Sequence, residues 1–431
     1  MSATSPSRAV AAMVSCLVVA AALFAPTARA AGPAQACRPG AASTDVFSRV
    51  GEQLADYLNA HNGSNGWLSA IAVAVVTPTG TQIVNCGVTT RGGTAAVDSA
   101  TRYELGSETK VFTATALAQL VERHVVALDD PLSRYFTGTL PAAGCPSAHG
   151  AEITLRMLAT HDAGLPRDPK NATWGLRNPM GRAGYTRADL DASFVRGFAS
   201  PCAALQTPPG TAYSYSNWGF ALLGTALTDA YFRSTHPGQA VPNVPAYGDM
   251  IQQLVTGPLR LPSTALELDG QPATTSQPSC PDDVATPCFW NNTNAYAGGG
   301  GLVSTIADMA AFVEANLSAS AGGPLAPGLA LTRQPAGYGP ACLHAPSSPT
   351  CQGLAWAIWP PGPQRPSPAF RTWEKDGGTW GSASNTWFMP DACWGMTVLT
   401  NSSSSTPVLL GPAGFVSELL RSVGPSRSLC R

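Results

Sequence analysis

The chain has 431 residues, of which 44% are hydrophobic and only 12% are charged, and its formal net charge is −1. A near-neutral chain without a run of basic residues lacks the electrostatic basis for binding nucleic acid. A chain of this length can bury a large hydrophobic core, and we expect two lobes that share one cleft.

The first thirty residues have the pattern of a secretory signal peptide. Arg8 precedes an apolar stretch from Ala9 to Phe24, and the small-residue site Ala28-Arg29-Ala30 follows. The stretch is too short for a comfortable membrane span, and no later stretch approaches the length that a span needs. We therefore predict a secreted or extracytoplasmic protein with no stable membrane span and an N-terminal extension over 31–45. A retained N-terminal anchor is the alternative.

The cysteine count also indicates export. Eleven cysteines become ten once Cys16 is lost with the signal peptide, an even number suited to disulfides in an oxidising compartment. Cys280/Cys288 and Cys342/Cys351 are the expected pairs, although sequence alone does not fix the connectivity. The competing interpretation is metal binding, which the spacing disfavours, because the chain has no Cys-x-x-Cys and no paired histidines.

Hydrophobic periodicity outlines strands at both ends of the chain and helices in the middle. We expect an amphipathic helix after Ser107. A sheet made from the early and late strands would be flanked by helices, which predicts a mixed α/β (α+β) fold with an all-helical insertion lobe. In chain order the expected elements are a helix over 46–58, strands over 70–76 and 82–88, mainly helices over 154–317, strands over 356–358, 384–389 and 395–399, and a helix over 409–423.

Only three lysines occur, at positions 110, 170 and 375, whereas arginine supplies the remaining positive charge. Lys110 follows Ser107 by three residues, so the two side chains share a face on a helix that begins near Ser107. A desolvated lysine can give up its proton and act as a base, which arginine cannot. The spacing therefore predicts an activated serine. The alternative is that Ser107 only caps the helix, although a capping box would place Glu or Gln three residues later.

A second motif, Tyr-Ser-Tyr-Ser-Asn at 213–217, follows Pro-Pro-Gly and precedes a helix. A phenol held between two ammonium groups has a lowered pKa and can relay protons, which suits Tyr215, while the Asn217 amide can hydrogen-bond a substrate amide. Taken alone, these residues are typical of turn and capping chemistry.

A third motif, Lys375-Asp376-Gly377-Gly378, comes just before residues that favour a strand. Alone it indicates a tight turn. Its glycines would let a substrate backbone approach the sheet closely.

In this order, with helices between them, the three motifs resemble the penicillin-recognising family of active-site-serine enzymes. That family includes class C beta-lactamases and low-molecular-weight D-alanyl-D-alanine carboxypeptidases and endopeptidases. The resemblance runs from about residue 46 to the C-terminal helix, and the Cys280–Cys288 segment is most similar to the carboxypeptidase/endopeptidase branch. It implies a beta-lactamase/transpeptidase-like domain over 46–425, with a sheet lobe at 46–105 and 350–425 and a helical lobe at 106–349.

The resemblance implies a role for each motif residue and requires no metal or organic cofactor. Ser107 would be the nucleophile, and Lys110 and Tyr215 would share the proton transfers. The backbone N–H groups of Ser107 and Gly378 would form the oxyanion hole. The substrate would be held by Asn217, Lys375, Gly377 and Gly378.

The expected function is hydrolysis of D-alanyl peptides of peptidoglycan through an acyl-enzyme. A beta-lactamase or an esterase is the enzymatic alternative, and an inactive penicillin-fold binding protein is the non-enzymatic one. One departure from the family concerns Asp376, which occupies the place of a threonine that commonly helps to hold a substrate carboxylate. We expect an acid there to disfavour beta-lactams and peptides with a free C-terminus, and to favour amides, esters or internal cross-links.

Three other features are predicted to be structural. His161 and Asp162 could suggest a Ser-His-Asp triad, but a histidine near a helix C-terminus more often interacts with the helix carbonyls. Thr305 and Asp308, after the glycines at 298–301, indicate a capping box rather than a phosphate loop. The tryptophans late in the chain are expected in the core or the cleft wall rather than on a carbohydrate platform: Trp356, Trp359, Trp373, Trp380 and Trp387.

Overall fold

The structure is a computed structural model that describes most of the chain. The described residues are 37–39, 45–61, 68–90, 93–136, 152–171, 185–194, 201–241, 247–266, 295–319, 322–323, 325–337, 351–362, 366–379, 381–401, 415–425 and 427–430.

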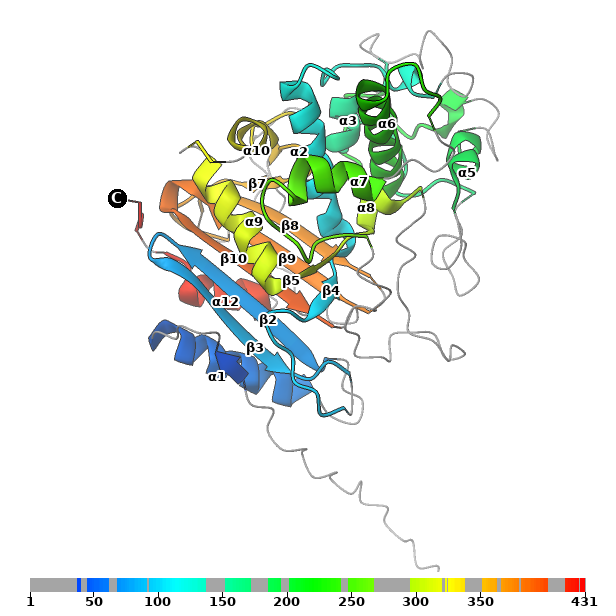
Figure 1. Cartoon of the computed structure of the whole chain (residues 1–431). Coiled ribbons are helices and arrows are strands. Elements are labelled where there is room, and N and C mark those ends of the chain that lie inside the picture. The colour runs from blue at the N-terminus through cyan, green and yellow to red at the C-terminus, as the bar shows by residue number, and fades with distance from the viewer. Residues whose placement is uncertain are drawn as a thin grey trace, which may run out of the picture.

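One large antiparallel sheet forms the frame of the molecule (Figure 1). Its strand order is β1-β3-β2-β10-β9-β8-β7-β6, so the early hairpin pairs with the last strand near the centre. This confirms the expectation that early and late strands share a sheet. The strands are β1 Cys37–Pro39, β2 Ala70–Thr77, β3 Gly80–Gly87, β6 Cys351–Gln352, β7 Ala357–Trp359, β8 Thr372–Gly378, β9 Ala383–Met389 and β10 Trp394–Thr400.

Helices α1 (Asp45–His61) and α12 (Phe415–Val423) lie along one face of the sheet (Figure 1). In α1 the fully buried residues Val50, Leu54 and Leu58 recur every four positions, which places them on one side of the helix. They pack against the side chains that the sheet presents on this face, and together they form one apolar cluster. Burying a side chain of this kind contributes about 1.5–3 kcal/mol.

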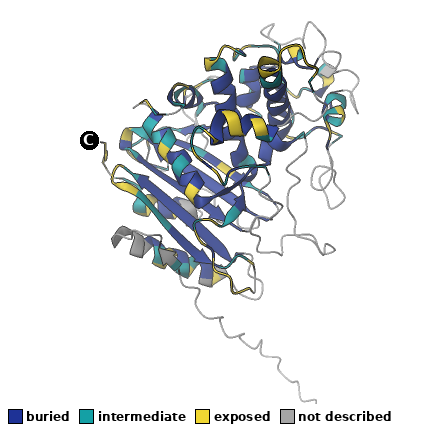
Figure 2. Cartoon of the chain, in the orientation of Figure 1, coloured by how far each residue is buried: buried dark blue, intermediate teal, exposed yellow. Residues whose placement is uncertain are grey.

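The remaining helices lie on the opposite face (Figures 1 and 2). Helix α9 (Ile306–Ser318) packs directly on β2 and β10, and the other helices gather beyond it around α2 (Thr109–Glu122). These are α3 Leu155–Ala159, α5 Arg187–Ala192, α6 Asn217–Thr235, α7 Tyr247–Ile251, α8 Ala297–Gly300 and α10 Ala326–Thr332. The mixed α/β architecture with a large antiparallel sheet flanked by helices is as expected.

A second, two-stranded sheet joins the beginnings of α2 and α9. Strand β4 (Arg102–Glu104) pairs antiparallel with β5 (Val303–Thr305). The sequence analysis did not predict either strand, because each has only three residues. Their pairing brings the segment that leads into Ser107 next to the glycine-rich helix α8, which ends just before β5.

Two local predictions were wrong. Helix α2 is not amphipathic: residues from Thr109 to Leu120 are buried, because the helix runs through the interior and contacts α6, α8 and α10. The residues Lys375–Gly378 do not form a tight turn but the end of strand β8, where they pair with Ala383–Thr386 of β9. The turn follows at 379–382, where Thr379 N donates to Ser382 O.

The predicted capping box at the start of α9 is half formed. The Thr305 hydroxyl accepts a hydrogen bond from Asp308 N, as expected of an N-cap residue. The Asp308 carboxylate does not return to Thr305 but accepts from Ser263 N and the Thr264 hydroxyl, both at 2.8 Å. It therefore ties the start of α9 to the preceding loop.

Disulfides are present, as predicted. Cys37–Cys86 joins β1 to β3, and Cys393–Cys430 fastens the C-terminal segment to the turn before β10. Cys202 and Cys351 are disulfide-bonded as well. The expected pair Cys280/Cys288 lies outside the described residues, and so does Cys342, the expected partner of Cys351. The predicted signal peptide also lies outside them.

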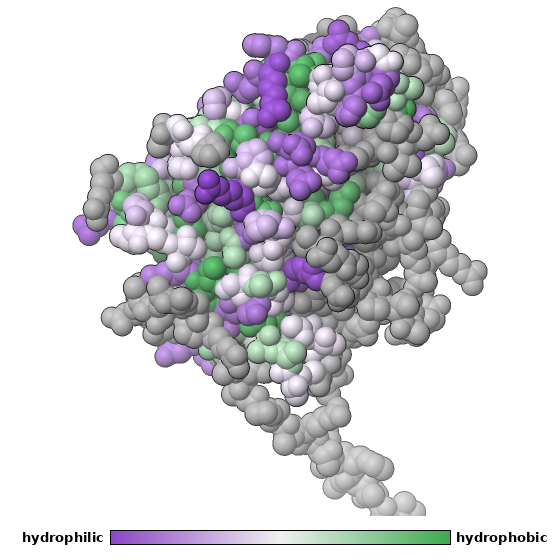
Figure 3. All heavy atoms as spheres, viewed as in Figure 1, coloured by the Kyte–Doolittle hydropathy of each residue, from purple (hydrophilic) through white to green (hydrophobic). Residues whose placement is uncertain are grey.

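Within the described ranges, no helix combines the length and the apolar character that crossing a membrane would require. On the described part of the face shown in Figure 3, hydrophilic and hydrophobic residues lie interspersed.

Candidate active site

Ser107 lies in a tight helical turn, Gly106–Glu108, between β4 and α2, and is partly exposed. Gly106 has a φ of +52°, a conformation that favours glycine. A Cβ atom on Gly106 would come within 2.6 Å of the backbone N and O of Gly378. The turn that carries the serine therefore touches the end of β8, and only a glycine permits this approach.

Further contacts fasten the same turn to the sheet. A Cβ atom on Gly377 would collide with the Leu105 carbonyl oxygen. The Ser384 hydroxyl on β9 donates to that same carbonyl at 2.9 Å. The Glu104 carboxyl, buried in β4, accepts from the Thr379 hydroxyl at 2.5 Å. Ser107 is thus held in place by β8 and by β9.

Lys110 is fully buried, and its side chain reaches back to Ser107. Its Nζ lies 3.1 Å from Ser107 Oγ, 2.9 Å from Asn217 Oδ1 and 2.5 Å from the Gly299 carbonyl oxygen. A neutral amine has two N–H donors and one lone pair. If Asn217 and Gly299 accept the two donors, the lone pair faces Ser107 Oγ.

The pKa of Lys110 lies below its ordinary value. Burial is the main cause, since it disfavours the charged form, and the nearby positive charges of Lys375 and Arg167 lower it further. Both effects increase the fraction of neutral amine that can accept a proton.

The Tyr215 phenol donates a hydrogen bond to Ser107 Oγ at 2.7 Å. Burial alone would raise its pKa, but the positive charges of Lys110 and Lys375 together outweigh that effect, and the pKa lies below its ordinary value. The Lys110 and Lys375 nitrogens lie 5.1 and 5.5 Å from the centre of the Tyr215 ring. Lys110 and Tyr215 are therefore a coupled pair in which either member can give up a proton.

Tyr215 and Asn217 are placed by the start of α6. Ser216 is the N-cap residue, and its hydroxyl accepts from Gly219 N at 2.9 Å. Ser216 therefore caps the helix, as expected of turn and capping chemistry. Its neighbours Tyr215 and Asn217 are bonded to Ser107 and Lys110, as expected of site residues. Asn217 Nδ2 donates to Asp168 Oδ1 at 3.2 Å, which leaves its second amide hydrogen for another acceptor.

Lys375 is also buried, but its partner is an acid. Its Nζ donates to Asp376 Oδ1 at 2.8 Å and to the Asp376 carbonyl oxygen at 2.5 Å. Burial opposes its charge, but the negative charge of Asp376, helped by Tyr215, outweighs burial and raises the pKa of Lys375 above its ordinary value. The Lys375 ammonium in turn lowers the pKa of Asp376.

His161 takes no part in a Ser-His-Asp triad. Its Nδ1 accepts a hydrogen bond from Ser216 N at 3.0 Å, so this nitrogen carries no proton. Burial and the charges of Lys110, Lys375 and Arg167 hold its pKa well below the usual range. His161 therefore has a structural role, as expected, although the expected interaction with the helix carbonyls is not among its described contacts. Instead a neutral ring supports Tyr215, with the ring centres 4.4 Å apart.

The structure brings the three sequence motifs together around Ser107, and it adds residues that the sequence analysis missed. The Gly299 carbonyl and Asp168 hold Lys110 and Asn217, and the Arg167 guanidinium lies 5.2 Å from the Tyr215 ring centre. No local pattern marks a backbone carbonyl as a partner of a distant lysine. Arg167 and Asp168 directly follow Gly164-Leu165-Pro166, a turn that could have drawn attention to them.

Of the tryptophans, Trp356, Trp373 and Trp387 are buried in the core, as expected. Trp359 is partly buried and donates to Glu374 Oε2 at 2.6 Å, and Trp380 lies outside the described residues.

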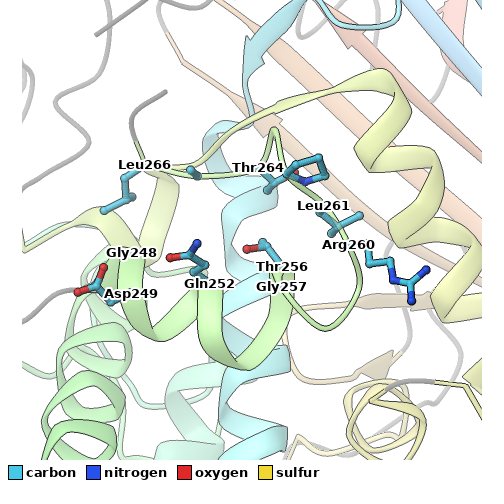
Figure 4. A pocket seen from close by; sticks show the side chains of 11 residues that line it. Gly248, Asp249, Gln252, Thr256, Gly257, Arg260, Leu261, Thr264 and Leu266 are labelled. Carbon is cyan, nitrogen blue, oxygen red and sulfur yellow. The ribbon is translucent and has the colours of Figure 1, made fainter. Parts of the chain in front are cut away.

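A separate hollow of about 620 Å³ lies beside α7 (Figure 4). Its lining includes Asp249, Gln252, Thr256, Arg260 and Leu266, and none of the residues around Ser107 lines it. Across the described part of the chain, no group of three or more His, Cys, Asp and Glu side chains has an arrangement that could hold a metal ion.

The fold and the residues around Ser107 place the chain among the serine hydrolases. It belongs to the beta-lactamase family, whose model matches residues 57–417. A curated relative, the D-alanyl-D-alanine-carboxypeptidase/endopeptidase AmpH of Escherichia coli K12, is 30% identical over 285 residues. The aligned part is 64% of this chain and 63% of AmpH, so the chain spans less than two thirds of that relative.

Solved structures show the same fold at low identity. A beta-lactamase/D-alanine carboxypeptidase from Yersinia pestis has a TM-score of 0.62 at 22% identity, over 85% of this chain and 98% of its own. A class C beta-lactamase from Rhodobacter sphaeroides has a TM-score of 0.62 at 19% identity, over 88% of this chain and 97% of its own. These likenesses concern the fold.

Proposed function

We propose that the protein is an exported serine hydrolase that cleaves D-alanyl peptides of peptidoglycan through an acyl-enzyme. The observation that carries this proposal is the position of Ser107 Oγ, 3.1 Å from the Lys110 amine and 2.7 Å from the Tyr215 phenol. A hydroxyl is a weak nucleophile unless a neighbouring base takes its proton. Both neighbours have lowered pKa values, which suits that task.

In the acylation step, Ser107 Oγ attacks the carbonyl carbon of the scissile amide and its proton passes to the Lys110–Tyr215 pair. The C–N bond then breaks, and the pair returns the proton to the leaving amine. In the second step a water molecule attacks the ester as its proton passes to the same pair. The C–O bond to Ser107 then breaks, the pair returns the proton to Ser107 Oγ, and the acid product is released.

The backbone N–H groups of Ser107 and Gly378 are the proposed oxyanion hole. The contact between Gly106 and Gly378 supports this role, because it fixes the two segments against each other before substrate binds. A preorganised donor of this kind typically contributes about 3–4 kcal/mol to lowering the barrier.

The edge of β8 is the proposed substrate platform. Strand β7 pairs with Thr372–Glu374 only, and within the described ranges no strand continues that pairing along Lys375–Gly378. An extended peptide can therefore add to this edge through main-chain hydrogen bonds, with Gly377 and Gly378 allowing close approach. The remaining Asn217 amide hydrogen would bind a carbonyl of the acyl part, and Lys375 would supply a fixed positive charge.

Asp376 favours a narrower substrate range. It is 55% exposed, and its carboxylate partly neutralises the Lys375 ammonium. A substrate carboxylate at this position would meet a negative charge, so esters, amides and internal cross-links are the preferred substrates. Asp376→Thr should raise turnover of a carboxylate-bearing substrate, and unchanged turnover would remove this idea.

Export is the proposed setting. Cys37–Cys86 and Cys393–Cys430 support it, because structural disulfides persist in oxidising compartments.

Labelling with a fluorescent penicillin tests the proposed function, with the adduct mapped by mass spectrometry. A stable label on Ser107, formed slowly because of Asp376 and absent in Ser107→Ala, together with cleavage of internal D-alanyl cross-links in peptidoglycan fragments, is the expected result. Rapid loss of the label would indicate a beta-lactamase instead. No label and no peptide cleavage would contradict the proposal in favour of an esterase or a non-catalytic binding protein.

A further inference from the structure

Two ion pairs lie near Tyr215, and each joins a buried side chain to an exposed one. In the first pair Lys375 is 6% exposed and Asp376 is 55% exposed. In the second pair Asp168 is 14% exposed and Arg167 is 69% exposed. The exposed members carry opposite charges, so the surroundings of Tyr215 present a carboxylate from one segment and a guanidinium from another.

The backbone of Arg167 is anchored to the site. Its carbonyl oxygen accepts hydrogen bonds from Asn217 N at 2.8 Å and Trp218 N at 3.1 Å, both in the first turn of α6. The preceding residue, Pro166, accepts from the Ser216 hydroxyl at 2.7 Å. The same turn of helix therefore positions both Asn217 and Arg167.

The guanidinium of Arg167 is less completely paired than those of Arg156 and Arg187. Its ion pair with Asp168 joins Nε to Oδ2 at 3.8 Å, while Asp168 Oδ1 is engaged by Asn217. Among the described residues its two terminal nitrogens have no carboxylate partner. By contrast, Arg156 forms two bonds of 2.8 Å to Asp129, and all three nitrogens of Arg187 have acceptors.

We propose that Arg167 binds a carboxylate on the acyl side of the substrate and so selects acidic peptides. This inference rests on the proposed function, in which Asn217 binds a carbonyl of the acyl part of the substrate. Because the Arg167 backbone is bonded to Asn217, Arg167 is placed on the same side of the substrate. A planar guanidinium on a side chain that is 69% exposed can bind a carboxylate through two parallel hydrogen bonds. Asp376 repels an anion from the β8 side, so the two exposed charges together fix which way an acidic substrate lies.

The experiment measures binding rather than turnover, in the Ser107→Ala background of the full chain. Two ligands are compared by calorimetry, N-succinyl-D-alanine methylamide and its succinamyl analogue, which differ only in a carboxylate or a neutral amide. The expected result is a preference of about ten- to one-hundredfold for the succinyl ligand, reflecting a charge-assisted bidentate contact. The preference should shrink as salt is added.

Arg167→Met should abolish the preference while leaving succinamyl binding within about threefold, and Arg167→Lys should keep part of it. Arg134→Met is the matched control, because Arg134 is 61% exposed and paired with Asp130 on the surface, and the preference should survive that change. A preference that survives Arg167→Met, or that never exists, overturns the inference. Failure of the proposed function would show separately, as absence of the penicillin label on Ser107.

Discussion

The two lysines near Tyr215, one on α2 and one on β8, have similar positions but opposite electrostatics. Both are buried, and their nitrogens lie 5.1 and 5.5 Å from the same ring centre. The partners of Lys110 are neutral oxygens from Ser107, Asn217 and Gly299, whereas Lys375 is paired with a carboxylate. Burial therefore lowers the pKa of Lys110. At Lys375 burial also opposes the charge, but Asp376 and Tyr215 together outweigh it and raise the pKa.

This difference shows how one cleft can use the same side chain in two ways. A buried lysine surrounded by neutral acceptors can lose its proton and serve as a base. A buried lysine beside an aspartate stays charged. The positive charge of Lys375 also lowers the pKa values of Lys110 and Tyr215, so the fixed cation helps the base to function.

The largest expected effect comes from replacing the base. Lys110→Arg places a permanent cation beside Ser107 and so removes the possibility of proton loss. We expect acylation by fluorescent penicillin to slow by at least roughly a thousandfold, within the range of general-base catalysis. Lys170→Arg is the matched control, because Lys170 is exposed. If Lys110→Arg acylated nearly as fast as wild type, Lys110 would not be the base.

A smaller effect is expected from a buried acid near Lys375. Glu108 is fully buried, and its carboxyl has no hydrogen-bond partner among the described residues. Lys375 and Asp376 on β8 and the Ser384 and Thr386 hydroxyls on β9 lie around it. Burial is the main reason why the pKa of Glu108 is raised to about 7.

Because the folded state favours protonated Glu108, the stability it contributes is present below about pH 4.5 and is lost as the pH rises through about 7. Glu108→Gln should remove this loss, on the order of 3 kcal/mol at about 1.4 kcal/mol per pKa unit. Urea unfolding at pH 5 and pH 8 measures it. Glu374 also has a pKa raised to about 7, so the difference between variant and wild type is the informative quantity. Parallel curves for the two proteins would show that Glu108 does not titrate as described.

Gly377→Ala should separate the serine turn from the sheet that holds Lys375. The added Cβ would collide with the Leu105 carbonyl, so we expect a loss of about 1–3 kcal/mol in unfolding free energy and a slower acylation. Gly51→Ala in α1 is the matched control. Its Cβ would meet atoms no closer than 3.9 Å, and alanine favours a helix, so a small gain in stability is expected. Equal behaviour of the two variants would argue against the close contact.

The smallest effect concerns the charge beside Lys375. Asp376→Asn removes the carboxylate that raises the pKa of both Lys375 and Tyr215. The Lys110–Tyr215 pair would then lose its proton more easily, so the acid limb of the acylation pH profile should move to lower pH, by about one unit or less. A shift to higher pH would contradict the electrostatics described here.

The fold was predictable because its signals are local and repeated. The short apolar runs of the hairpin strands and the four-residue spacing of Val50, Leu54 and Leu58 identify elements that the structure contains. The buried character of α2 was not predictable, because the periodicity of one segment does not say how many neighbours will surround it. The β-strand character of Lys375–Gly378 was missed for a similar reason, since pairing with β9 outweighs the turn preference of two glycines.

For the site, the sequence predicted the residue types and not their environment. The spacing of Ser107 and Lys110 follows from a single turn of helix, which is local information. The Gly299 carbonyl, the position of Arg167 and the burial of Glu108 depend on segments brought together by the fold. Such contacts are fixed by tertiary packing, which no short pattern records.

The most direct test of the central claim is a titration of the lysine side chains by NMR. The chain has only three lysines, so lysine labelled at Nζ gives few signals, which Lys110→Arg, Lys170→Arg and Lys375→Arg assign. We predict that Lys110 loses its proton at a lower pH than a free lysine and that Lys375 keeps its proton to a higher pH. Titration of the two residues at the same pH, or in the reverse order, would contradict the assignment of Lys110 as the base and Lys375 as the fixed cation.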